Sequence, residues 1–223
     1  MPPPDRLDIV TTAQLAALQD RVAAEGLMRA RCMVVPVDPI TAICRVLGRY
    51  KMYVDLRDTG FVPHLMFEGY WEYWITDFMW RNVRAGQVVL DVGANHGYYT
   101  VLLSDLVGPA GRVHAIEPNP RLVELLGLNV SVNGFWHVAE VRAAAVGASD
   151  GLDPAQFARH EVPIVSLDGV VPGRADFVKI DVEGAEEPVW HGMQGLIARS
   201  PGMGIGMEFN PARCRDPRGT VSE

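Results

Sequence analysis

Cysteine, basic charge and long apolar runs are all scarce in this sequence. Its three cysteines, Cys32, Cys44 and Cys214, are widely spaced and odd in number, which argues against a disulfide framework or a structural zinc site. The chain has 20 basic and 27 acidic residues, for a net charge of -7. A general nucleic-acid binder normally has a basic surface, so that class is disfavoured. No run of about 18 apolar residues occurs, and we therefore expect no membrane span.

Targeting segments, repeats and low-complexity tracts are also missing. The first residues, Met1–Asp5, offer neither the basic start nor the apolar core of a secretory signal. Because we also expect the cysteines to be reduced, the cytoplasm is the expected location. Hydrophobic residues make up 48% of the 223 positions, so the chain can build one substantial α/β domain with a modest extension.

The N-terminal part is expected to be a helical extension over residues 1–49. Thr11 and Thr12 are candidate caps of a helix that runs to about Arg29. Apolar and polar residues then alternate over 50–57, as in a half-buried strand.

A helix with a single apolar stripe is predicted next. Its apolar residues recur at i, i+3, i+4, i+7 and i+8, the spacing of one helix face. They are Trp71, Trp74, Ile75, Phe78 and Met79. We expect this stripe to face the core.

From residue 88 onward, segments typical of strands and helices alternate. The predicted strands are 88–92, 112–116, 138–146, 175–180 and 203–209. The predicted helices are 98–107, 120–132 and 186–199, and Asn119 is the expected cap of the second. The residues 147–163 are predicted to form a surface loop. Such alternation predicts an α/β fold with a doubly wound, mostly parallel sheet and right-handed crossovers. We assign residues 50–223 to this domain.

Five strands are fewer than a complete domain of this kind usually has. The tail over 213–223 is polar and shows no strand pattern. Two explanations are open: the domain is truncated at its C-terminus, or the strand at 50–57 occupies an edge of the sheet.

The turn from Asp91 to Gly97, directly after the first core strand, is the strongest functional feature. Gly93 allows a tight turn and a close approach to the backbone, and Gly97 allows close packing of the next helix. The N-terminus of that helix offers free N–H groups that suit a ligand carboxylate. Asp91 is expected to point into the crevice where open α/β sheets bind ligands.

Glu117 and Asn95 narrow the ligand of this turn. Glu117 ends the next strand, about 20 residues after Gly97, where an acid can hold ribose hydroxyls. Asn95 stands where a dinucleotide fingerprint has its second glycine, and it hinders the approach of a pyrophosphate. S-adenosylmethionine has no pyrophosphate, so it is the predicted cofactor. A generic glycine turn with an incidental glutamate is the plainer alternative.

A second group of polar residues follows the strand at 175–180. Asp181 and Glu183 come at the same edge of the sheet as the turn, and either could orient or deprotonate an acceptor hydroxyl with help from Lys179. Ordinary acids at a helix N-terminus are the alternative reading of this segment. Glu208 could also face the crevice, and His96 is more simply a polar filler of the turn.

These segments together resemble the FkbM-type family of S-adenosylmethionine-dependent methyltransferases. The resemblance rests on the segments 53–55, 68–72, 89–100, 111–120, 128–129 with Asn133, and 179–186. It implies a Rossmann-like class I methyltransferase fold and O-methylation of a hydroxyl on a sugar, a glycan or a polyketide natural product. It also implies that Glu72 belongs to the cofactor region, and that Ala144–Val146, with Ala145 at its centre, and Ser149-Asp150 lie near the adenine.

The sequence therefore predicts an S-adenosylmethionine-dependent O-methyltransferase with a small-molecule or glycan acceptor and no nucleic-acid partner. The predicted cofactor-binding residues are Glu72, Asp91, Gly93, Asn95, Gly97, Glu117, Asn119, Ala145 and Asp181. The predicted catalytic residues are Asp181, Glu183 and Lys179. No resident metal is predicted, although Asp181 and Glu183 could hold Mg²⁺ with the acceptor hydroxyl. A nicotinamide-dependent oxidoreductase and a non-catalytic cofactor-binding domain are the alternatives.

Overall fold

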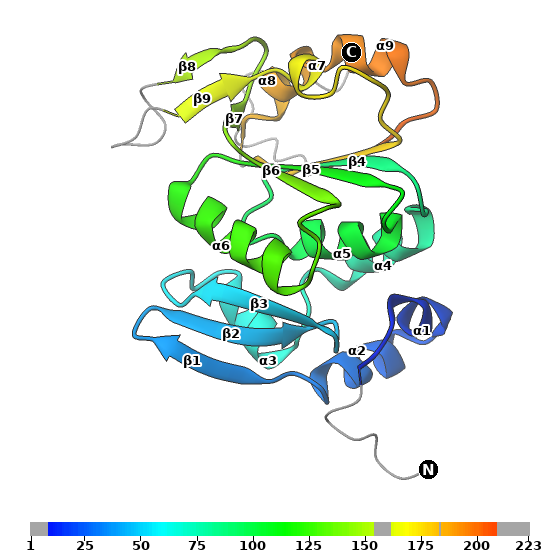
Figure 1. The fold of residues 1–223 in the computed structure, drawn as a ribbon. Helices are drawn as coiled ribbons and strands as arrows, with labels where there is room; N and C mark the ends of the chain where they lie inside the picture. Colours follow the sequence, from blue (N-terminus) through cyan, green and yellow to red (C-terminus); the bar gives the residue numbers. More distant parts are fainter. Residues whose placement is uncertain (1–8, 154–161, 183, 209–223) are drawn as a thin grey trace.

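The computed structural model describes residues 9–153, 162–182 and 184–208, and it stacks a parallel sheet between two layers of helices (Figure 1). A smaller antiparallel sheet from the N-terminal part lies beyond one helix layer. No helix in these described ranges is both long and apolar enough to cross a membrane.

The central sheet has five parallel strands in the order β11-β10-β4-β5-β6. They are β4 (Val88–Val92), β5 (Arg112–Glu117), β6 (Ala139–Ala143), β10 (Phe177–Ile180) and β11 (Gly204–Met207). Each of the five predicted strands contributes to this sheet, but the single strand predicted over 138–146 is wrong at its end, because Ala145–Val146 forms β7 in a separate small sheet. The chain runs from β4 towards β6 on one side and returns to β10 on the other, so a topological switch point lies between β4 and β10.

Helices cover both faces of this sheet, as the predicted doubly wound fold requires (Figure 1). One layer contains α4 (Tyr73–Asn82), α5 (Tyr98–Val107) and α6 (Pro120–Val132). The other contains α7 (Leu167–Val170), α8 (Glu186–His191) and α9 (Gln194–Arg199). The predicted bounds of α5 and α6 are confirmed, and Asn119 caps α6 by accepting the backbone N–H of Arg121. The single helix predicted over 186–199 is wrong, because Gly192 packs against the backbone of Gly147 and interrupts it.

The N-terminal part is only half helical, which corrects the prediction for residues 1–49. The predicted helix is two short ones, α1 (Thr12–Ala17) and α2 (Arg21–Arg29), because Leu18 is extended and Asp20 caps the second. The strands β1 (Val34–Asp38), β2 (Thr41–Val46) and β3 (Tyr50–Asp55) then form a separate antiparallel sheet. The strand predicted over 50–57 is confirmed at its start. It is not an edge of the central sheet, because it pairs with β2 through the short turn at 47–49.

The stripe predicted to face the core, which lies mostly on α4, does so only in part: Met79 is buried in the core and Trp71 packs against it, but the other three residues are exposed. Trp74, Ile75 and Phe78 are 66%, 38% and 46% exposed, whereas Tyr73, Thr76 and Trp80 are buried. Thr76 explains the rotation of the helix, because its hydroxyl bonds the buried hydroxyl of Tyr98 at 3.0 Å. A polar residue therefore occupies the centre of the buried face.

Three further elements complete the described chain. The helix α3 (Val62–Phe67) precedes α4. The loop predicted at 147–163 contains β8 (Gly151–Asp153) and the first half of β9 (Val162–Val165). In a small sheet, β9 pairs with β8 on one side and with β7 (Ala145–Val146) on the other. The prediction of an irregular loop is therefore wrong for 151–153 and 162–163.

Candidate functional site

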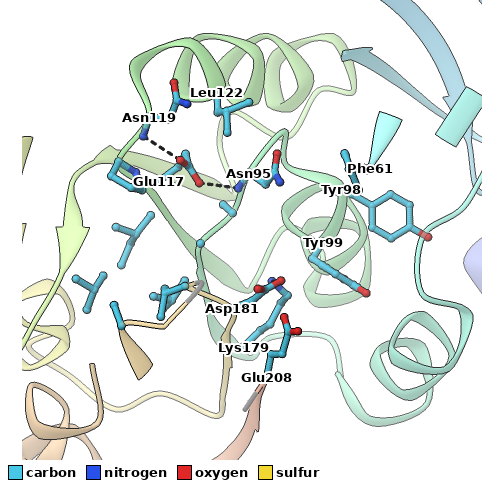
Figure 2. A pocket seen from close by; sticks show the side chains of 18 of the residues that line it. Phe61, Asn95, Tyr98, Tyr99, Glu117, Asn119, Leu122, Lys179, Asp181 and Glu208 are labelled. Atoms are coloured by element: carbon cyan, nitrogen blue, oxygen red, sulfur yellow. Dashed lines mark hydrogen bonds and ion pairs between the residues drawn. The ribbon is translucent and has the colours of Figure 1, made fainter. Parts of the chain in front are cut away.

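A cavity of about 590 Å³ lies at the carboxyl ends of β4, β5 and β10, at the switch point of the sheet (Figure 2). Its volume is within the range of roughly 300–1,000 Å³ that is usual for small-molecule sites. Glu117 and Asn119 lie on one side of the view, and Lys179, Asp181 and Glu208 gather on another. The position agrees with the general rule for ligands of open α/β sheets.

Most of the predicted site residues line this cavity. They are Glu72, Gly93, Asn95, Glu117, Asn119, Ala145, Lys179 and Asp181. Glu208, which the sequence offered as a candidate, also lines it. Glu183 lies outside the described residues. Asp91 and Gly97 do not reach the cavity wall.

The turn after β4 depends on two glycines for steric reasons. Gly93 has φ +76°, and a Cβ there would lie 1.8 Å from the backbone oxygen of Asp181. Gly97 has φ +91°, and its Cβ would lie 2.4 Å from Leu126 Cδ1 on α6. A side chain at either position would push the turn away from β10 or from α6. The glycines therefore fix the turn against its neighbours, which places Asn95 at the cavity wall.

Glu117 is a buried carboxylate whose two oxygens both accept backbone N–H groups. Its Oε2 accepts from Asn95 and its Oε1 from Asn119, each at 2.9 Å (Figure 2). Burial raises the pKa of this carboxyl above its ordinary value, while the two N–H donors oppose the shift. Each carboxylate oxygen has a second lone pair. The side chain can therefore accept two more hydrogen bonds from the cavity, as the two hydroxyls of a ribose would require.

Lys179 is the centre of a charged cluster on the other side of the cavity. Its Nζ lies 3.3 Å from Asp181 Oδ2, 3.6 Å from Asp91 Oδ1 and 4.8 Å from the centre of the Tyr99 ring. Lys179 stands between Asp91 and the cavity, and Thr100 on α5 donates its hydroxyl to Asp91 Oδ2 at 2.6 Å. Asp91 is therefore fully buried. The prediction that it points into the crevice is wrong, and its contacts instead orient Lys179.

Glu72 and Tyr99 extend this cluster. The Tyr99 hydroxyl donates a hydrogen bond to Glu72 Oε2 at 2.9 Å. Glu72 has φ 39° and ψ 72°, a left-handed conformation that is uncommon for a residue other than glycine. Such a backbone persists only where its surroundings hold it, often at functional sites. The placement of Glu72 at the cavity agrees with the role that the family resemblance implies.

Acidic side chains dominate the cavity wall. Among the lining residues that the structure describes, five are carboxylates and one is a lysine: Asp58, Glu72, Glu117, Asp181, Glu208 and Lys179. Asp91 adds another buried acid behind Lys179. A ligand with a net positive charge would be favoured here, and an anionic ligand would meet repulsion.

Several lining residues were not found from the sequence. Asp58, Phe61, Trp71 and Tyr99 are the main examples. Tyr99 could have been suspected, because the first turn of a helix after a cofactor turn faces the crevice. Asp58 and Phe61 come from a segment without strand or helix periodicity, and Trp71 was assigned to the apolar stripe of a helix instead of the cavity.

Only some of the residues that the family resemblance places near the adenine line the cavity. Ala144, Ala145 and Val146 line it. Asp150 does not, because its Oδ1 accepts the backbone N–H of Ser166 at 2.7 Å. That contact holds the small sheet together.

No group of three or more His, Cys, Asp and Glu side chains within the described ranges is arranged to hold a metal ion. Asp181 and Glu183 were the candidates for Mg²⁺, and Glu183 lies outside those ranges. The magnesium alternative thus has no supporting cluster in the described part of the chain.

The parallel sheet, the glycine turn and the cavity at the switch point define a Rossmann-like methyltransferase fold. Residues 91–214 match the family description "Methyltransferase FkbM domain". The chain belongs to this family. The expected family and fold class are confirmed.

Curated relatives match shorter stretches. The protein-L-isoaspartate O-methyltransferase of Aeropyrum pernix is 48% identical over 56 residues, which is 25% of this chain and 22% of that protein. The enzyme of the same name from Caenorhabditis elegans is 30% identical over 119 residues, covering 42% of this chain and 53% of its own. The chain thus spans between about a fifth and about half of the length of these relatives.

Solved structures align with parts of the chain. Methyltransferase FkbM from Methylobacillus flagellatus KT aligns with a TM-score of 0.44 and 21% identity, over 50% of this chain and 30% of its own. Methanocaldococcus jannaschii Trm5 in complex with adenosine aligns with a TM-score of 0.43 and 18% identity, over 76% and 40% of the two chains.

Proposed function

We propose that this protein transfers a methyl group from S-adenosylmethionine to an uncharged hydroxyl of a sugar, a glycan or a natural product. The observation that supports the proposal most directly is the acidic wall of the cavity around a single lysine among its described lining residues. S-adenosylmethionine has a net positive charge, from a sulfonium and an ammonium group against one carboxylate. The wall is complementary to that charge.

The residues of the cavity divide into a cofactor part and an acceptor part. Glu117 would accept hydrogen bonds from the ribose hydroxyls, with Asn119 and Asn95 holding its two oxygens. Gly93 and Ala145 would shape the wall beside the nucleoside. The side chains around Lys179 would contact the reactive end of the cofactor and the acceptor.

Asp181 is the proposed base. Its side chain is 29% exposed towards the cavity, and Lys179 holds its Oδ2 at 3.3 Å. S-adenosylmethionine supplies an electrophilic methyl group, so that the acceptor needs orientation and removal of its proton. The Asp181 carboxylate would accept that proton, and Lys179 and Asp91 would keep the carboxylate in place. Glu183 remains an additional candidate for this role.

The charge of the cavity also supports a particular class of acceptor. A carboxylate or phosphate close to Glu72, Asp181 and Glu208 would be repelled in a partly enclosed site, where charges interact more strongly than in water. A neutral hydroxyl meets no such penalty. This distinguishes the proposal from methylation of an isoaspartate, the acceptor that the curated relatives' name gives for them.

A methyl-transfer assay with radiolabelled S-adenosylmethionine tests the acceptor class. Neutral glycosides and polyketide alcohols are expected to be labelled, whereas an isoaspartyl peptide and a tRNA are not. Labelling of either anionic acceptor at a rate above that of every neutral alcohol would contradict the proposal.

Asp181→Asn tests the proposed base on whichever acceptor is labelled. Because general-base catalysis contributes about 10²–10⁴-fold, we expect kcat to fall by about 100-fold or more while the affinity for S-adenosylmethionine changes little. Glu124→Gln, at an exposed acid on α6, is the matched control and should retain full activity. An unchanged kcat in Asp181→Asn would exclude Asp181 as the base.

A further inference from the structure

Two asparagines, Asn129 within α6 and Asn133 as its C-cap, form hydrogen bonds with the edge of β3 that does not pair with β2. Asn129 Oδ1 accepts the backbone N–H of Tyr53 at 2.6 Å, and Asn129 Nδ2 donates to the Tyr53 carbonyl at 2.9 Å. Asn133 makes the same pair of bonds to Lys51, at 3.0 and 2.7 Å. The spacings match, because two strand residues rise about 6.6–6.8 Å and four helix residues about 6 Å. The two amides thus replace a neighbouring strand.

His96 continues this row of contacts into the cofactor turn. The backbone N–H of Asp55, two residues beyond Tyr53, donates to His96 Nε2 at 3.1 Å. The His96 side chain is fully buried, and its ring stacks on Phe61 with 5.4 Å between ring centres. We call Asn133, Asn129 and His96 the β3 clasp. It ties the N-terminal sheet to α6 at two points and to the turn at a third.

The contacts of His96 determine where its proton lies. Because Nε2 accepts a backbone N–H, a neutral ring must have its hydrogen on Nδ1. Nδ1 lies 2.5 Å from Asn95 Oδ1, so it donates to that oxygen. The backbone N–H of His96 donates to the same oxygen at 2.7 Å. Burial lowers the pKa of His96 to about 4, which leaves the ring neutral at neutral pH.

These two bonds hold Asn95 in an unusual conformation with a direct consequence for the site. Asn95 has φ 52°, in the left-handed region that asparagine tolerates better than most residues. In this conformation its backbone N–H points at Glu117 Oε2. The chain of contacts therefore runs from β3 through His96 and Asn95 to the carboxylate that faces the cavity.

We propose that His96 is a positioning residue of the cofactor site, which fixes Asn95 so that Glu117 is aimed at the ribose of S-adenosylmethionine. The inference rests on the proposed cofactor role of Glu117. It assigns a function to a histidine that does not line the cavity and that the sequence presents more simply as a polar filler of the turn.

Two substitutions of His96 each remove one of the two hydrogen bonds of its ring and keep the other. A glutamine can place its oxygen near the position of Nε2 and keep the bond to Asp55, but it loses the donor to Asn95. An asparagine can place its amide nitrogen near Nδ1 and keep the donor to Asn95, but it loses the bond to Asp55. Asn133→Ala is the control, because it removes the clasp contact farthest from the turn.

The experiment measures calorimetric affinity for S-adenosylmethionine and the urea midpoint of unfolding for the wild type and the three variants. We expect His96→Gln to bind at least tenfold more weakly with a midpoint near that of the wild type. His96→Asn should recover most of the lost affinity while its midpoint falls. Asn133→Ala should lower the midpoint and change the affinity by less than twofold.

Two results would overturn the inference alone: wild-type affinity in His96→Gln, or a loss in Asn133→Ala as large as that in His96→Gln. The second would mean that docking of the sheet in general, not the bond to Asn95, supports the site. A wild-type protein that binds no S-adenosylmethionine would instead overturn the proposed function, and this inference with it.

Discussion

Two buried titratable residues, His96 and Glu117, meet at Asn95 and have pKa values shifted in opposite directions. Burial lowers the pKa of the histidine to about 4 and raises the pKa of the glutamate. In both residues, the charged form is the one that burial disfavours. The two shifts have opposite effects on how stability depends on pH, so His96 can be tested separately by substitution.

The free energy of unfolding should fall as the pH drops from about 6.5 towards 4, in part because of His96. The unfolded chain takes up a proton near 6.5, whereas the folded ring stays neutral until about 4, so acid favours the unfolded state in this window. At pH 5 the effect of His96 should be about 1–2 kcal/mol. Urea unfolding of the wild type and His96→Asn at pH 7 and pH 5 measures it as the difference between the two losses. Equal losses in both proteins would contradict the assigned protonation state.

At the level of single residues, the sequence predicted the acids of the site better than their orientation. Glu117 and Asp181 were found because strand ends and spacing place them at one edge of the sheet. Asp91 was assigned to the crevice by the same rule, yet Thr100 and Lys179 enclose it. That outcome depends on two side chains from other elements, which no local pattern of the sequence reveals.

Among the elements, those with clear end signals were predicted best. The helix α6 begins at an asparagine cap followed by proline and is confirmed at both ends. The face of α4 was misjudged because a buried threonine interrupts its apolar pattern. A periodicity argument places polar residues such as Thr76 on the exposed face. The structure buries Thr76 because its hydroxyl forms a hydrogen bond with the buried hydroxyl of Tyr98.

The turn after β4 gives a prediction for Gly93, with Gly127 in α6 as the comparison. Gly93→Ala should destabilise the protein by about 3 kcal/mol or more, because the new Cβ meets the Asp181 backbone and the left-handed conformation disfavours a side chain. Gly127→Ala, in the interior of α6 where a Cβ meets nothing within 4 Å, should instead stabilise it by about 0.5–1 kcal/mol. Urea denaturation compares the two variants. Similar effects of both substitutions would contradict the steric account of the turn.

At the scale of the whole molecule, the segment between the N-terminal sheet and β4 is part of the site. The family match begins at residue 91, but Asp58, Phe61, Trp71 and Glu72 also line the cavity. The alternation of strands and helices after residue 88 was sufficient to predict the central sheet. Of the sheet β1-β2-β3, the sequence predicted only the strand β3. The sheet is attached to the central domain by side-chain amides of Asn129 and Asn133, not by pairing of two strands, and no local sequence pattern predicts such contacts.

The division of the chain at residue 50 remains a prediction. The hairpin of β2 and β3 spans that position, so the antiparallel sheet includes residues from both sides of it. Asn129, Asn133 and His96 attach this sheet to the central domain. We therefore infer that the N-terminal sheet and the central domain act as one structural unit, to which the segment 58–72 adds part of the cavity wall.

The central claim is that Glu117 holds the cofactor in this cavity, and calorimetric titration with S-adenosylmethionine tests it most directly. The wild type should bind one equivalent, and Glu117→Ala should lose about 2–4 kcal/mol of binding free energy, the value of two hydrogen bonds to a charged group. Glu124→Ala should bind as the wild type does. Wild-type affinity in Glu117→Ala, or binding of NAD in place of S-adenosylmethionine, would contradict the account.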